Sequence, residues 1–169
     1  PLGQRTVSVT LAQTGIGYLA TAECLNRVQG SFTPFGAACS GTAGTPTHSA
    51  TGVPETGRTV NYLLAGARAF TNAYVLFGFS NTSYGGIPLP LDLGSIGVSG
   101  CNLLVSNDVS VAFSTNGAGS GSIPFAFSNS PWFVGVHLYS QALFLDVGNG
   151  RPTPLTLANG IDTLIGGFP

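Results

Sequence analysis

Residues 73–101 constrain the fold of this chain more than any other stretch, because they join a short apolar run to closely spaced turn signals. The apolar run covers residues 74–79, and the polar turn SNTS follows it at 80–83. Beyond the turn come a pair of glycines, a proline-rich segment and Cys101. An apolar run of this length between turn signals is typical of a strand that is buried on both faces. The rest of the chain is expected to supply the partners of that strand.

Further strand patterns recur at short intervals along the chain. They lie at residues 58–65, 70–80, 101–105, 109–114, 122–128, 132–147, 155–158 and 161–165. A bend is expected near Ser140, Asn159-Gly160 predicts a hairpin turn, and the proline-containing residues 87–93 suit a sheet edge. About nine or ten short strands without helix–strand alternation predict an all-β fold. The expected architecture is an antiparallel β-sandwich of the immunoglobulin-like or jelly-roll-like kind.

The N-terminal residues 1–30 are predicted to form a β-arm in front of a sandwich domain at residues 31–169, and the turn-rich segment 30–47 is the expected junction. Residues 4–13 alternate between apolar and polar side chains, as a half-buried strand does. One face of that strand carries Val7, Val9 and Leu11, and the other carries Thr6, Ser8 and Thr10.

Charge is scarce, since Asp, Glu, Lys and Arg make up 7% of the residues and the net charge is −1. The chain has neither the basic patch that nucleic acids require nor the polybasic segment that anionic lipids attract. No apolar stretch reaches the roughly 20 residues that a membrane span needs. A surface built from Ser, Thr, Asn and Gly lacks the charge that keeps proteins apart, so we expect it to carry glycans or to be covered by neighbouring subunits.

The three cysteines, Cys24, Cys39 and Cys101, fit no zinc or redox motif. In a charge-poor extracellular chain, a disulfide is the natural prediction. Cys39–Cys101 would join the entry of the domain to the end of residues 73–101, and Cys24–Cys39 is the competing pair. Either pairing leaves one cysteine that is buried and inert or bonded to a second chain.

No catalytic chemistry is predicted. His48 and His137 lie far apart in the sequence, and no G-x-S-x-G nucleophile motif is present. Asp92 and Asp146 are expected to bond nearby backbone at strand ends. A calcium site that uses Asp108, Asn107 or Asn149 together with carbonyl oxygens is a weaker alternative to such structural roles. The prediction is therefore a protein that is not an enzyme and that holds no cofactor or metal.

Aromatic side chains with a polar group suit a sugar-stacking surface, and Tyr84 is the best candidate because it lies in a turn beside Gly85 and Gly86. Asn81 begins a formal glycosylation sequon, Asn81-Thr82-Ser83, in the same turn. Polysaccharide is therefore one expected partner of this segment.

Residues 35–46 (FGAACSGTAGTP), 76–101 (LFGFSNTSYGGIPLPLDLGSIGVSGC) and 139–166 together resemble a Gly/Pro-rich module. Such modules occur at the C-terminal ends of secreted and surface proteins of planctomycete-like environmental bacteria. The resemblance covers roughly residues 35–167. It implies an extracellular β-sandwich without assigned catalytic residues, and it implies that Cys39 and Cys101 form the disulfide.

Free termini usually fray unless they are tied down, so the patterned arm predicts a docking edge on its own sandwich or on the next subunit. Strand addition between subunits is a head-to-tail contact, which makes a filament. We therefore expect a secreted structural protein at the cell surface that self-associates into a homopolymer. The alternative is a carbohydrate-binding or adhesion module of a larger surface protein.

Overall fold

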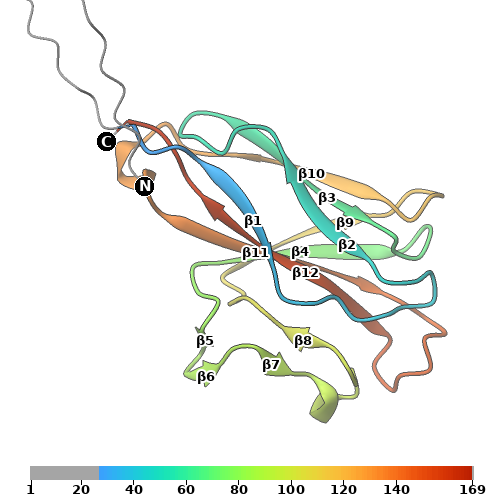
Figure 1. The fold of residues 1–169 in the computed structure, drawn as a ribbon. Helices are drawn as coiled ribbons and strands as arrows, with labels where there is room; N and C mark the ends of the chain where they lie inside the picture. The colour runs from blue at the N-terminus through green and yellow to red at the C-terminus, as the bar shows by residue number, and fades with distance from the viewer. Residues whose placement is uncertain (1–26, 169) are drawn as a thin grey trace, which may run out of the picture.

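The computed structural model describes residues 27–168 and confirms the predicted all-β sandwich (Figure 1). A five-stranded sheet has the order β1–β12–β11–β4–β9, a three-stranded sheet has the order β10–β3–β2, and neighbouring strands pair antiparallel. The strands of the larger sheet are β1 (Ser31–Phe35), β12 (Leu155–Leu164), β11 (His137–Leu145), β4 (Asn72–Gly78) and β9 (Val109–Ser114). Those of the smaller sheet are β10 (Gly121–Ala126), β3 (Thr59–Ala65) and β2 (Thr47–Thr51). The predicted arm strand at residues 6–11 lies outside the described residues.

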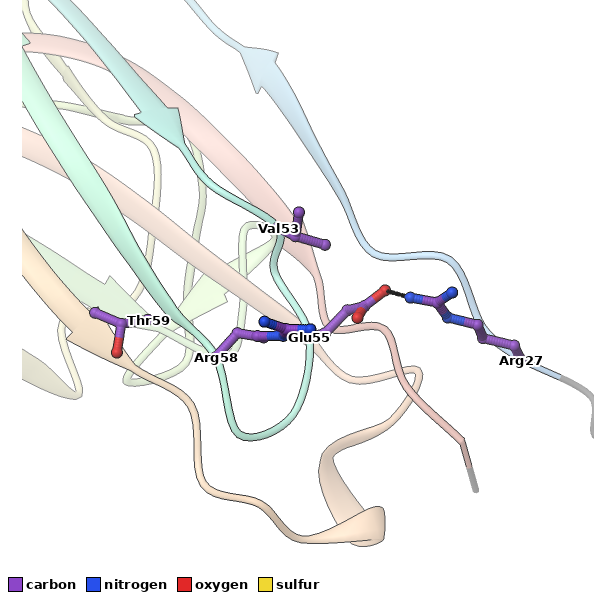
Figure 2. A pocket seen from close by; sticks show the side chains of 5 residues that line it. All are labelled: Arg27, Val53, Glu55, Arg58 and Thr59. Carbon is purple, nitrogen blue, oxygen red and sulfur yellow. Dashed lines mark hydrogen bonds and ion pairs between the residues drawn. The ribbon is translucent and has the colours of Figure 1, made fainter.

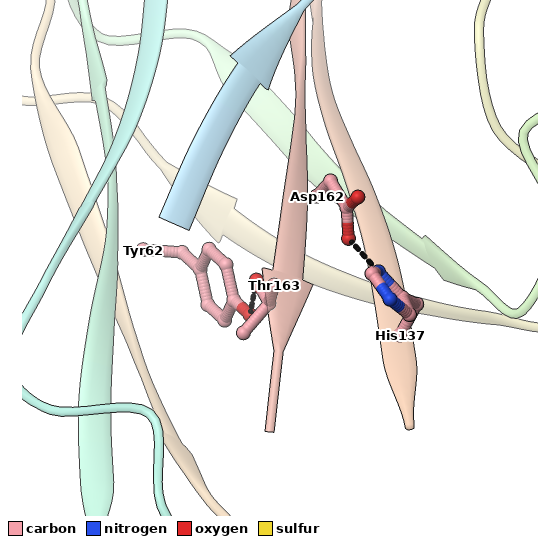
Figure 3. Close-up of polar contacts among 4 residues, drawn as sticks. All are labelled: Tyr62, His137, Asp162 and Thr163. Carbon is pink, nitrogen blue, oxygen red and sulfur yellow. Dashed lines mark hydrogen bonds and ion pairs between the residues drawn. The ribbon is translucent and has the colours of Figure 1, made fainter. Parts of the chain in front are cut away.

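The main hydrophobic core lies between the two sheets, where alternate residues of each strand point inward. Tyr62 of β3 is its largest fully buried side chain, and its hydroxyl lies 2.8 Å from the Thr163 hydroxyl of β12 (Figure 3). Burial raises the pKa of Tyr62 to about 12, so the hydroxyl stays neutral and bridges the two sheets. The preceding residue, Asp162, points to the other face of β12, and its carboxylate lies 2.7 Å from the Nδ1 of His137 (Figure 3).

A second layer covers the opposite face of the five-stranded sheet (Figure 1). It consists of residues 79–108, here called the cover segment. Its short elements are β5 (Ser83–Tyr84), β6 (Ile87–Pro88), β7 (Leu91–Asp92), the 3-10 helix η1 (Gly94–Ile96) and β8 (Asn102–Leu103). Leu76 packs under this segment, whereas Val75 and Phe77 face the main core. The second half of β4 is thus buried on both faces, as its apolar sequence predicts.

The disulfide joins Cys39 to Cys101, with the two Cα atoms 5.1 Å apart, and ties the cover segment to the loop after β1. Gln141 of β11 is a second anchor for the cover segment. Its side chain is fully buried. Its Oε1 accepts the Leu104 N–H at 2.9 Å. Its Nε2 donates to the Asn102 and Ala158 carbonyls at 3.0 and 2.9 Å, which satisfies the buried amide.

Asp146, directly after β11, holds the loop between β1 and β2 in place. Its carboxylate accepts the Thr42 N–H at 2.9 Å and the hydroxyls of Thr42 and Thr156. Burial opposes the charged carboxylate, but these hydrogen bonds and the attraction of Arg68 keep the pKa of Asp146 below its usual value. Asp92 accepts the Gly94 N–H at 2.8 Å, so both carboxylates bond backbone as predicted.

The predicted hairpin at Asn159-Gly160 is wrong, because both residues lie inside the continuous strand β12. A side chain at Gly160 would meet the Phe35 ring at 2.6 Å, so this glycine allows a close approach rather than a turn. The expected bend near Ser140 is present as a bulge between Gln141 and Leu143. Residues 87–93 form ribbons of the cover segment, and not an edge of either main sheet.

Two strands of the main sheets were not predicted, since β1 and β2 lie wholly or partly in segments that we expected to form turns. A further 3-10 helix, η2 (Pro131–Phe133), precedes β11 where the sequence suggests strand. Within residues 27–168, no helix has the length and apolar character that a membrane crossing requires.

Candidate functional site

The exposed edges of the two sheets are the parts of this fold that are most able to bind another chain, because an edge strand offers unpaired N–H and C=O groups. The two sheets have four such edges, formed by β1, β9, β10 and β2. Proteins protect these edges with proline, charge or covering side chains. Three of the four edges carry such protection.

Proline protects two edges. Pro34 lies within β1 and Pro124 within β10, and a proline is tolerated in an edge strand where its nitrogen faces away from the ladder. For β10 the hydrogen bonds establish this orientation. The Phe127 N–H donates to the Arg58 carbonyl, so alternate residues from there point at β3 and Pro124 points outward.

A side chain protects the edge of β2. The His48 N–H donates to the Asn159 Oδ1 at 2.9 Å, and the Asn159 Nδ2 donates to the His48 carbonyl at 2.9 Å. The amide of Asn159 thereby pairs with β2 as a neighbouring strand would. This role explains why asparagine stands at a position where the sequence suggests a turn.

The remaining edge, β9, is open. Its sequence VSVAFS contains no proline and no charge, and Val109 is 57% exposed. The Thr115 N–H donates to the Thr71 carbonyl, so alternation directs Phe113, Val111 and Val109 toward β4. The N–H and C=O groups of the three intervening residues therefore point away from the sheet. Within residues 27–168 no backbone or side-chain group hydrogen-bonds to them, and the start of β10 at Gly121 lies close to the carbonyl of the last one. These residues are Ser110, Ala112 and Ser114.

Both carbohydrate candidates lie in the cover segment. Tyr84 is 38% exposed in β5, and Asn81 is half-buried in the turn before it. Two further aromatic side chains are strongly exposed. Trp132 is 87% exposed on η2, and Phe70 is 82% exposed with a left-handed backbone (φ 51°). The apolar pattern around Trp132 had suggested a strand, and no pattern distinguishes an exposed aromatic residue from a buried one.

The two histidines do not form a reactive site with an acid. His48 is buried, its Nδ1–H donates to the Leu63 carbonyl at 3.1 Å, and its Nε2 lies 3.0 Å from the Ser140 hydroxyl. Ser140 is fully buried as well, so a substrate has no path to this Ser–His pair. The acid that contacts a histidine, Asp162, binds His137 on the other face of β12. Among the described residues, no three His, Cys, Asp or Glu side chains gather as metal ligands.

The hollows on the surface are shallow. One hollow of about 300 Å³ lies where the chain enters the fold, and Arg27, Val53, Glu55, Arg58 and Thr59 line it (Figure 2). Arg27 and Glu55 form an ion pair across it. The guanidinium of Arg58, which also lines the hollow, makes no ion pair or side-chain hydrogen bond within residues 27–168.

We expect the stability of this fold to fall as the pH is lowered from about 6.5 to about 4. Burial lowers the pKa of His48 to about 4, and the bond to the Leu63 carbonyl opposes this shift only in part. The unfolded chain, with an ordinary histidine pKa of about 6.5, then binds the proton more readily than the folded chain does. The free energy of unfolding should drop by about 3 kcal/mol between pH 7 and pH 4.

Urea unfolding at several pH values measures this loss. His48→Gln should remove the slope between pH 6.5 and 4, whereas His137→Gln should keep it, because it leaves His48 and its partners in place. Asp146 also contributes to the free energy of unfolding, but this contribution is lost at a lower pH than that of His48. The reason is that the pKa of Asp146 in the folded chain lies below its usual value of 3.8. An unchanged slope in His48→Gln would contradict the assignment.

Comparison of this chain with family models, with curated proteins and with solved structures gives no match. The resemblance to modules of bacterial surface proteins therefore stays a prediction from motifs.

Proposed function

We propose that this protein is a secreted structural subunit of an extracellular filament or surface assembly, joined by β-strand addition of its N-terminal arm. The open edge of β9 carries the proposal. The three other sheet edges are protected by Pro34, Pro124 and Asn159. The six residues of β9 are uncharged, and three of them point their N–H and C=O groups outward. A long, uncharged and unprotected edge is a binding site for an added strand.

Two further observations support assembly outside the cell. The Cys39–Cys101 disulfide suits an oxidising compartment, since reduced thiols prevail in the cytosol. With 7% charged residues, the surface also lacks the repulsion that keeps soluble proteins apart. A homopolymer covers such a surface with further copies of the same chain.

Deletion of residues 1–13 and the substitution Ala112→Pro should each abolish polymer formation. The deletion removes the donor strand, and the proline removes an outward N–H of the acceptor without breaking the β4 ladder. Negative-stain electron microscopy and sedimentation of the purified protein measure the polymer. Ala126→Pro on β10 is the matched control, because Ala126 is also exposed and its N–H also faces a free edge.

The control variant should assemble as the unchanged protein does. If Ala112→Pro and the deleted chain still form filaments, strand addition at β9 is wrong. If the unchanged protein stays monomeric at high concentration, the filament proposal itself fails.

A carbohydrate-binding or adhesion module is the second candidate. The observation that favours it is the exposure of Tyr84, next to the Asn81 sequon, and of Trp132. Exposed aromatic rings stack on sugars, and a half-wet position suits tyrosine and tryptophan. Retention of the monomer on insoluble polysaccharide, with loss of binding in Tyr84→Ala, would favour this function over assembly.

A further inference from the structure

We infer that residues 6–11 of a second copy pair with β9 in one antiparallel register, in which Ser8 lies opposite Ala112. This inference rests on the proposed function and identifies the partner segment and its alignment. It follows from three features of β9: the direction of its free hydrogen-bonding groups, the pattern of its side chains, and its place in the sheet.

The free groups of β9 fix which of its residues exchange hydrogen bonds with a new neighbour. Ser110, Ala112 and Ser114 point their N–H and C=O groups outward, so they form the hydrogen-bonded pairs with an added strand. The existing sheet pairs its neighbouring strands antiparallel, and an antiparallel addition continues that pattern with slightly better hydrogen-bond geometry.

The side chains of β9 alternate as those of the arm do. Val111 and Phe113 pack against the main core and stay half-exposed, and Val109 on the same face is exposed. Residues directly opposite each other in a ladder share a face, so an apolar donor row should lie against this apolar row. The small and polar residues of both strands then share the other face.

One alignment satisfies all six positions. It pairs Val7 with Phe113, Val9 with Val111, Leu11 with Val109, Thr6 with Ser114, Ser8 with Ala112, and Thr10 with Ser110. A slip of one residue would place the apolar side chains of the arm on the polar face of β9. A slip of two would leave two residues of each strand without a partner.

The position of β9 favours a second copy as the donor. The described chain enters through β1, and β1 and β9 form opposite edges of the same sheet (Figure 1). An arm that leaves beside β1 meets the β9 edge of a neighbour when subunits follow one another in line. The contact then joins two different surfaces and repeats without closing.

A cysteine cross-link between two separately substituted chains tests the register. One chain carries Ser8→Cys and the other Ala112→Cys, both with Cys24→Ser, and the mixture is assembled and mildly oxidised. Opposite residues of a hydrogen-bonded pair have Cα atoms about 5.5 Å apart, which a disulfide spans. Non-reducing gels should show covalent dimer at about tenfold the level of a Val9→Cys with Ala112→Cys mixture, because Val9 points to the other face.

Several results would overturn the register. Equal cross-linking by Ser8→Cys and Val9→Cys would show an alignment that is not fixed. Dimers of Ala112→Cys alone would show that two β9 edges pair with each other. A further chain carries both Ser8→Cys and Ala112→Cys, and a disulfide that forms only within that chain, without covalent dimers, would place the arm on its own sandwich. Filaments that do not cross-link would reject this register and leave strand addition standing, whereas the absence of any polymer from the unchanged protein would reject the proposed function as well.

Discussion

Replacing Cys39 and Cys101 by alanine is expected to lower the free energy of unfolding by about 4 kcal/mol. The bond closes a loop with a sequence separation of 62, so its loss frees a long segment of the unfolded chain. The two cysteines also belong to the hydrophobic cluster that holds the cover segment on β12, together with Val98 and Leu157. Loss of the bond therefore weakens the attachment of that segment.

Denaturant unfolding with and without a reductant measures the effect. The unchanged protein should lose about as much stability in dithiothreitol as the double variant loses by mutation, about 4 kcal/mol. The double variant should not respond to the reductant, which makes it its own control. A loss below about 1 kcal/mol would show that the other contacts hold the cover segment without the bond.

Gln141→Ala is expected to cost about 4 kcal/mol of stability, because two buried backbone groups and one part-buried group lose their partner and a cavity replaces the side chain. Gln29→Ala, at an exposed glutamine, is the matched control and should change stability by less than about 0.5 kcal/mol. Equal effects of the two substitutions would contradict the anchoring role of Gln141.

Gln141→Glu separates hydrogen bonding from side-chain volume. A carboxylate at this place would keep the bond from the Leu104 N–H but would face the carbonyls of Asn102 and Ala158. Burial and those carbonyls should raise the pKa of the new carboxyl. The stability gap to the unchanged protein should therefore narrow as the pH falls and the carboxyl becomes protonated, which urea unfolding between pH 8 and pH 5 measures.

Regular alternation made much of the fold predictable from sequence. The strand pattern at 109–114 coincides with β9, and the pattern at 58–65 matches β3 within one residue. β1 and β2 escaped prediction because Pro34 and His48 interrupt their apolar patterns. In the structure Pro34 lies on a protected edge, and His48 is a buried polar residue whose partners come from distant segments.

The candidate site depends on information that no local pattern contains. Whether β9 is an edge follows from the order of strands, and that order results from packing between distant parts of the chain. The cap on β2 is of the same kind, since Asn159 and His48 are far apart in sequence. Residues 6–11 show a strand pattern, but a pattern does not reveal the edge on which a strand docks.

The protection of three sheet edges limits how many neighbours a subunit can bind. In the proposed assembly, one donor arm and one open acceptor at β9 give each subunit a valence of two, and units of valence two join into unbranched chains. The Asn159 cap and the two edge prolines then act as limits on branching as well as on stability. If one of these protections were lost, the exposed edge could accept a strand from a further subunit. The polymer would then branch at that subunit, and a branched polymer forms a gel rather than a fibre.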